Sequence, residues 1–317
     1  MKNEKRNQER GVLKRYAGGS DPVLSEEIHA VGKKAFLRAK IDSCTCRASE
    51  LGVSAFAQSG VRRVELLGQR CRIGDRAFEN CEKLESVAFS GGELRIGSSA
   101  FRGCASLTEA AFLERTVSLG SYAFDSCTAL THVILGPEIE TLEEGVFANC
   151  EGLQTVAFQR EYGQFPDWLF SGCRALTAVP WTKGIQSIGY AAFQNCWELT
   201  EVTLPESIRT TGQLCFSGCK QLRRAKWDAL CAQIPAGAFL FCEELEEIDI
   251  PEGVKTIGEY AFWSCRKLTY LRLPDSLREI GKQAFFGCGS CTVEIGPNTR
   301  RGQWERDVKE VICRNCR

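Results

Sequence analysis

A spacing of 23 residues between phenylalanines constrains the fold of this chain more than any other feature. Each of these phenylalanines is followed by cysteine three residues later, and the spacing never slips. The phenylalanines are Phe78, Phe101, Phe124, Phe147, Phe170, Phe193, Phe216, Phe239, Phe262 and Phe285. A fixed period between about 20 and 50 residues is typical of stacked supersecondary units. The chain is therefore predicted to be a repeat protein.

Two less regular copies precede this series. They centre on Phe36 and Phe56, each with an apolar residue and a glycine shortly before it. Together the copies predict about twelve coils and three segments. These are a basic, flexible N-terminal tail (residues 1–23), a solenoid (24–296) and a C-terminal cap or tail (297–317).

The clearest copy spans residues 257–274 and follows the pattern I-G-x-x-A-F-x-x-C-x-x-L-x-x-L-x-L-P. Its Leu-rich half alternates between inward and outward positions as a strand does, and proline ends the pairing because it has no N–H. The Ile-Gly pair predicts a bend at positive φ, and Asn, Gly or Ser two residues after phenylalanine predicts a second corner. The Ala-Phe segment is expected to form a helical or 3₁₀ turn. Since one coil cannot cover its own apolar side chains, identical positions must stack between neighbours.

This unit resembles the BspA-like leucine-rich repeats of bacteria and some protists, over residues 24–296. The resemblance implies an α/β repeat solenoid. In detail, this is a right-handed leucine-rich-repeat superhelix with a parallel β-sheet on one face and short helical or 3₁₀ turns and loops on the other. It also implies binding of proteins or surface ligands, and in many members a secreted or cell-surface adhesin role.

The charge balance argues against two classes of partner. The 40 basic and 40 acidic residues leave no global field that would favour nucleic acid or an anionic membrane. Residues 1–15 lack a signal-peptide core, and no apolar run reaches the length of about 18 residues that a membrane helix requires. We therefore expect a cytoplasmic protein without nucleic-acid binding or membrane insertion. The alternative is a cell-surface protein, or one secreted by a non-classical route.

Most of the 18 cysteines belong to the repeat. Stacked one per coil, these thiols are expected to be reduced, buried and in contact with backbone carbonyls. The pairs Cys288-x-x-Cys291 and Cys313-x-x-Cys316 have the spacing of a zinc site. However, Cys288 is the last repeat cysteine and Cys291 occupies a core leucine position. Free thiols or a cap are therefore favoured, and no cofactor is expected.

Enzymatic activity is not expected. The two histidines, His29 and His132, lie far apart in the repeat, so a histidine-based catalytic group is difficult to assemble. The sequence contains no nucleotide-binding, metalloprotease or nucleophile-elbow motif.

Residues eight and ten positions after each repeat phenylalanine are predicted to point away from the core and form an open face. This face is small and apolar around His132 and Ile134, and further along the chain its charges alternate from strand to strand. The candidate partner-binding residues in that second part are Arg224, Lys226, Glu247, Asp249, Tyr270 and Arg272. One interpretation is a docking groove whose charges fix the register of a partner. The other is that the charges pair across strands and keep the sheet soluble.

A second candidate surface lies one residue after the repeat phenylalanine. Polar residues there give way to Leu240, Trp263 and Phe286 on successive coils, with Phe241 beside them. Stacked together, these side chains predict an exposed apolar strip of the kind that marks an interface. The alternative is that the C-terminal tail folds back over the strip as a cap.

The resulting hypothesis is a non-catalytic interaction scaffold that binds a protein partner through its strand face. A cell-surface adhesin or host-interaction protein is one alternative. A zinc-stabilised interaction module that uses the C-terminal CxxC pairs is another. The identity of the partner and the oligomeric state are not specified by the sequence.

Overall fold

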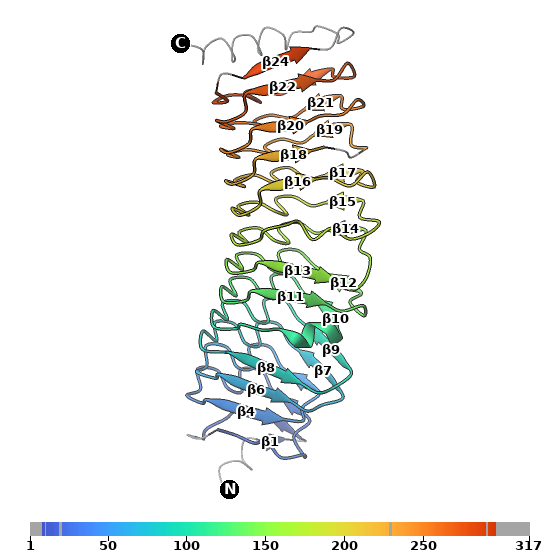
Figure 1. Ribbon diagram of the computed structural model, residues 1–317. Coiled ribbons are helices and arrows are strands. Elements are labelled where there is room, and N and C mark those ends of the chain that lie inside the picture. The colour runs from blue at the N-terminus through green and yellow to red at the C-terminus, as the bar shows by residue number, and fades with distance from the viewer. Residues whose placement is uncertain (1–7, 10, 19–20, 228–229, 290, 296–317) are drawn as a thin grey trace. The chain divides into compact units, whose positions relative to one another are not determined.

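The computed structural model describes residues 8–9, 11–18, 21–227, 230–289 and 291–295 (Figure 1). It divides into two compact units, unit 1 (residues 1–160) and unit 2 (residues 161–317). Within each unit the chain winds into stacked coils, and the equivalent strands of successive coils pair in parallel. With about eleven turns in all, close to the predicted twelve, the structure confirms the solenoid fold.

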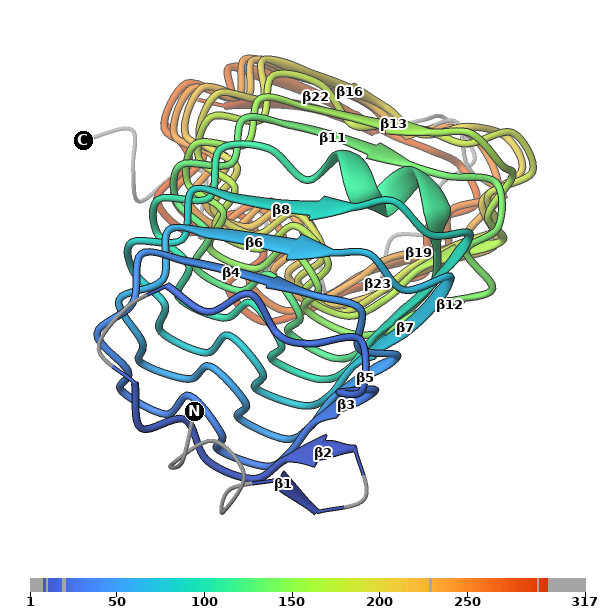
Figure 2. The same cartoon turned by 90° about the horizontal axis from the view of Figure 1, so that it is seen from below.

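Unit 1 contains two ladders of short strands, which lie on separate sides of the coils (Figure 2). The strand face follows the Leu-rich segments and consists of β4 (Ser43–Cys46), β6 (Arg63–Leu66), β8 (Ser86–Phe89), η2 (Ala111–Arg115), β11 (His132–Leu135) and β13 (Thr155–Phe158). The Ile-Gly edge consists of β1 (Gln8–Glu9), β2 (Val12–Leu13), β3 (Ala30–Val31), β5 (Glu50–Leu51), β7 (Arg70–Ile73), β9 (Glu93–Ile96), β10 (Thr116–Leu119) and β12 (Thr141–Leu142).

Unit 2 has the same two ladders. Its strand face consists of β16 (Glu201–Thr203), β18 (Arg224–Lys226), β20 (Glu247–Asp249), β22 (Tyr270–Leu273) and β24 (Thr292–Ile295). Its Ile-Gly edge consists of β14 (Gln164–Phe165), β15 (Ser187–Ile188), β17 (Thr210–Thr211), β19 (Gln233–Ile234), β21 (Thr256–Ile257) and β23 (Glu279–Ile280). Only the strand-face ladder was predicted as a sheet; the Ile-Gly edge forms a second one.

The Ala-Phe segment forms tight turns in place of the expected helical or 3₁₀ turn. In the coil of Phe78, both Arg76 and Asn80 have φ of 56°. A left-handed residue interrupts a right-handed helix, so no helix continues through the segment. Alternate N–H groups point to the next coil instead: Phe78 N donates to Ala100 O at 2.7 Å, and Asn80 N to Arg102 O at 2.7 Å. The corner expected two residues after phenylalanine is thus confirmed at Asn80.

Two coils depart from the prediction that every Leu-rich segment is a strand. In one, η2 replaces the strand, because Ala111–Arg115 contains good helix formers and no β-branched residue. In the other, residues 177–180 form no strand, and Pro180 has no N–H to donate to a ladder. Within the described part of the chain, no helix is long and apolar enough to cross a bilayer.

The repeat phenylalanines form the centre of each unit. They are buried, and neighbouring rings stack with centroids 5.1 Å apart for Phe56–Phe78, 5.5 Å for Phe193–Phe216 and 5.3 Å for Phe262–Phe285. These separations lie in the range of favourable offset-stacked aromatic pairs. The ring of one coil is therefore covered by the ring of the next.

The repeat thiols donate to backbone carbonyls of the preceding coil, as predicted. Cys81 Sγ lies 3.0 Å from Phe56 O, and Cys265 Sγ lies 3.2 Å from Phe239 O. Every cysteine that the structure describes is a free, buried thiol. The thiol column thus fills small core spaces and also gives these carbonyls a partner.

We predict that these thiols resist alkylation in the folded protein. Burial raises the pKa of Cys81 from its ordinary 9.0 to about 11 and that of Cys288 to about 12. The folded state keeps these protons at pH values where the unfolded chain loses them. The contribution of the thiols to the stability of the fold is therefore complete below about pH 9, and it is lost as the pH rises through 11. Mass spectrometry at pH 8 should find little iodoacetamide on the repeat cysteines of the native protein and complete labelling of them in urea. Rapid labelling of native Cys81 or Cys288 would contradict this account.

The Ile-Gly glycines have a different role from the one predicted. Their φ angles lie outside the left-handed region, so they do not form a bend at positive φ. Instead, a Cβ at Gly258 would lie 2.4 Å from Ala236 N, and one at Gly281 would lie 2.4 Å from Glu259 N. Glycine is required because the backbones of successive coils approach too closely for any side chain.

The substitution Gly258→Ala should therefore destabilise the protein by about 2 kcal/mol, the cost of overpacking a close contact. Gly163→Ala is the matched control, since a Cβ there would meet nothing within 4 Å, and removing a glycine stiffens the unfolded chain slightly. Unfolding in urea gives the free energy of unfolding of both variants. Equal free energies of unfolding for the two would refute the close-approach explanation.

Ordered structure begins before the predicted solenoid boundary at residue 24. In β2, Val12 and Leu13 pair in parallel with β3, and Leu13 is buried. The Tyr16 ring lies 4.8 Å from the Phe36 ring and so continues the aromatic column. Residues 297–317, predicted as a cap, lie outside the described residues.

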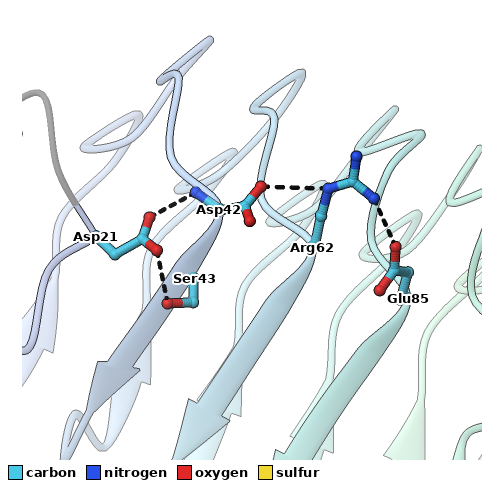
Figure 3. Close-up of polar contacts among 5 residues, drawn as sticks. All are labelled: Asp21, Asp42, Ser43, Arg62 and Glu85. Carbon is cyan, nitrogen blue, oxygen red and sulfur yellow. Dashed lines mark hydrogen bonds and ion pairs between the residues drawn. The ribbon is translucent and has the colours of Figure 1, made fainter.

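Polar contacts also hold Asp21 to the first coils (Figure 3). Its carboxylate accepts the Asp42 N–H at 2.6 Å and the Ser43 hydroxyl at 3.1 Å. Backbone hydrogen bonds from Ser43 and Asp42 lower the pKa of Asp21. The row continues as Arg62 pairs with Asp42 at 3.2 Å and with Glu85 at 2.7 Å. Charges on the coil surface thus pair between coils.

Candidate interaction surface

The predicted outward residues of unit 2 lie on the strands of the strand face, of which β16, β18 and β20 pair in one sheet. In β16, β18 and β20 the outer residues are exposed and the middle one is buried. The register places Arg224 beside Glu247 and Lys226 beside Asp249. The alternation of the strand therefore directs these four side chains outward, as the sequence indicates.

A shallow depression of about 770 Å³ lies over these strands. Its lining includes all six charged and aromatic residues predicted for this part of the face: Arg224, Lys226, Glu247, Asp249, Tyr270 and Arg272. It extends past the ends of the strands to Pro251, Glu252 and Pro274. The sequence placed these side chains on one face but gave no sign that this face is hollowed.

The electrostatics of the depression combine paired and unpaired charges. Arg224 Nε lies 2.7 Å from Glu247 Oε1, and both side chains are more than 60% exposed. Such a pair contributes little to stability, so part of the charge pattern serves cross-strand pairing. None of the ion pairs that the structure describes involves Asp249 or Arg272. These two side chains can meet a partner's charges without first breaking an ion pair.

Tyr270 is held at one side of the depression. Its hydroxyl donates a hydrogen bond to the Glu294 carboxylate of β24, and this bond raises the pKa of the tyrosine. The ring is 47% exposed. Tyr270 therefore offers a fixed, amphipathic surface, a feature common at the centre of interfaces.

His132 and Ile134 belong to unit 1. On β11, Ile134 is 43% exposed and pairs with Ala157 of β13, while His132 pairs with Thr155. The His132 Nδ1 lies 2.8 Å from the Thr131 hydroxyl. Ile134 and Ala157 are small or apolar, and His132 and Thr155 beside them are polar and exposed.

The predicted apolar strip is also present in unit 2. Trp263 packs against Phe286, with ring centroids 4.6 Å apart. Phe286 is 45% exposed, whereas Leu240 and Trp263 are half-buried. The sequence reasoning missed Tyr260, whose ring lies 5.2 Å from that of Trp263. Its position two residues before Phe262, on the same turn, was the available signal.

A second arrangement that the sequence reasoning missed surrounds Trp197. The Arg174 guanidinium and the Lys220 ammonium lie over its ring, 4.3 and 4.2 Å from the centroid. All three residues stand four positions after a repeat phenylalanine, on successive coils. Cation–π attraction thus stabilises a column of like-positioned side chains.

The four cysteines considered for zinc are only partly described. Cys288 Sγ donates to Phe262 O at 3.1 Å and Cys291 is buried, while Cys313 and Cys316 lie outside the described residues. Among the residues that the structure places, no three His, Cys, Asp or Glu side chains gather in a way that could hold a metal. Both described thiols occupy core positions, as favoured above.

A protein-family model matches most of the chain. The model for the BspA type leucine rich repeat region, in six copies, matches residues 49–177 and 163–292. A search of curated proteins finds no significant match.

Solved structures share the fold at low sequence identity. A leucine-rich repeat protein from Bacteroides ovatus is 20% identical, with a TM-score of 0.68 over 94% of this chain and 92% of that one. One from Eubacterium ventriosum is 18% identical, with a TM-score of 0.59 over 92% of this chain and 88% of that one. A leucine rich cell surface protein from Faecalibacterium prausnitzii is 20% identical, with a TM-score of 0.52 over 93% of this chain and 92% of that one. These likenesses establish the fold.

Proposed function

The chain belongs to the BspA-type leucine-rich repeat family, and from that premise we propose that it is a non-catalytic scaffold that binds a protein partner. The contact surface is the depression on the strand face of unit 2. One observation carries the proposal: the depression is lined by the outward charged residues of β18 and β20 and by Tyr270 and Arg272.

The chemistry of the depression suits recognition of a polar protein surface. The charge alternates from strand to strand, at the spacing of adjacent strands, about 4.8 Å. The residues are basic on β18 and acidic on β20, and β22 carries Arg272. A partner with charges in the opposite order is favoured, and one displaced by a strand meets like charges. The rows therefore confer register and specificity more than affinity.

Catalysis is not part of the proposal. The ionisable groups of the depression stand in rows on exposed strands, and Arg224 and Glu247 neutralise one another. Activated acids, bases or nucleophiles usually need burial or an unbalanced charge to shift their pKa. The depression is open and its charges are mixed, which supports binding.

The test is a comparison of partner capture from the native organism by full-length wild type and by the double variant Arg224→Glu/Lys226→Glu. We expect the variant to lose a wild-type-specific partner at least about tenfold, since two contacts become repulsive. The control is Arg63→Glu, an exposed strand-face residue of β6 in unit 1, which should retain the partner. Equal capture by wild type and the double variant would exclude the depression as the contact surface.

A further inference from the structure

The turns of the last coils carry a cluster of exposed rings that the proposed function does not use. Trp263 lies between Tyr260, 5.2 Å away, and Phe286, 4.6 Å away, measured between ring centroids. Tyr260 is 40% exposed, Phe286 45% and Phe241 47%. We call Phe241, Tyr260, Trp263 and Phe286 the aromatic strip. It lies on the Ala-Phe turns, whereas the depression lies on the strands.

Backbone hydrogen bonds between coils fix the position of the strip. Phe241 N donates to Trp263 O at 2.8 Å, and Tyr260 N donates to Lys282 O at 3.1 Å. The turns therefore do not need to be ordered when a partner binds. A preorganised aromatic cluster loses little entropy on association, so its burial is favourable.

Two unpaired charges of opposite sign flank the strip. Glu259 and Lys282 occupy the same repeat position, three residues before Phe262 and Phe285, and both are exposed. Neither makes an ion pair with any residue that the structure describes. Adjacent cations are already neutralised, since Arg266 pairs with Glu243 at 3.4 Å and Lys267 with Glu244 at 2.6 Å.

This charge pattern selects among the possible occupants. An anionic membrane would require an excess of free basic residues. Among the residues that the structure describes, the flank of the strip has one free acid, Glu259, for its one free base, Lys282. The complementary surface is apolar, with a base opposite Glu259 and an acid opposite Lys282, one coil apart. The strip itself has this composition when its coil order is reversed.

We propose that the aromatic strip is the contact surface for a second copy of this chain. A two-fold axis that lies between the coils of Phe262 and Phe285, perpendicular to the stacking direction, reverses the coil order. Trp263 then packs on Phe286 of the second copy, and Glu259 meets its Lys282. Because a two-fold interface is self-complementary, each of these contacts occurs twice.

Sedimentation equilibrium of the full chain tests the apolar half of the proposal. Between about 1 and 100 µM we expect a reversible monomer–dimer equilibrium, the range for a small interface. Phe286→Ser should weaken dimerisation at least about tenfold by removing a buried anchor. Val53→Ser, which changes an apolar side chain in unit 1 that is 41% exposed, should leave it unchanged. A monomeric wild type, or a Phe286→Ser dimer as tight as wild type, overturns the proposal.

Charge exchange tests the geometry. Glu259→Lys and Lys282→Glu each place like charges opposite one another twice, so each variant alone should dimerise about tenfold more weakly than wild type. An equimolar mixture restores both contacts, and it should associate within about threefold of wild type. Circular dichroism confirms that both variants are folded. A mixture that associates no better than the separate variants overturns the two-fold arrangement.

Discussion

The contact between successive coils is the interaction on which the rest of this structure depends. Phe78 makes three kinds of contact with the next coil. Its N–H donates to Ala100 O, its carbonyl accepts the Cys104 thiol at 3.2 Å, and its ring stacks on Phe101 at 5.0 Å. An isolated coil would leave all of these groups exposed or unsatisfied, so the stack is the smallest stable unit.

The same stacking builds the surfaces. Because equivalent residues fall in columns, a surface column carries one side chain per coil. The residue at such a position does not pack in the core, so it can be substituted freely, and the substitutions set the chemistry of the column. Arg224 beside Glu247 on the strand face and Trp263 beside Phe286 on the turns both arise in this way. A repeat protein of this kind can therefore vary the chemistry of its surface without changing its fold.

The sequence predicted what depends on periodicity. The solenoid, the buried phenylalanines, the thiol-to-carbonyl contacts and the outward direction of Arg224 and Asp249 all follow from a fixed register. Predictions from the sequence were wrong where the same residues are compatible with several conformations. Gly258 suits a bend at positive φ as well as a close backbone approach, and only the position of the neighbouring coil distinguishes them.

Three further features also escaped prediction, for physical reasons. Arg76 adopts a left-handed φ although its side chain does not favour it, because inter-coil hydrogen bonds on both sides hold the turn. The segment Ala111–Arg115 occupies a strand position, and its helix formers override the repeat locally. The depression is lined by residues of β16, β18, β20 and β22 together with Pro251 and Pro274, so the pattern of a single coil does not record it.

Deleting one whole period within unit 2 tests the dependence on stacking most directly. Removal of residues 200–222 joins Leu199 to Arg223 and keeps every column in register, whereas removal of residues 200–211 shifts the columns after the junction. After the first deletion we predict that urea unfolding stays cooperative and that the free energy of unfolding falls by the contribution of about one interface between coils. After the second deletion we predict that the cooperative transition is lost. Equal unfolding behaviour of the two deletions would contradict the account.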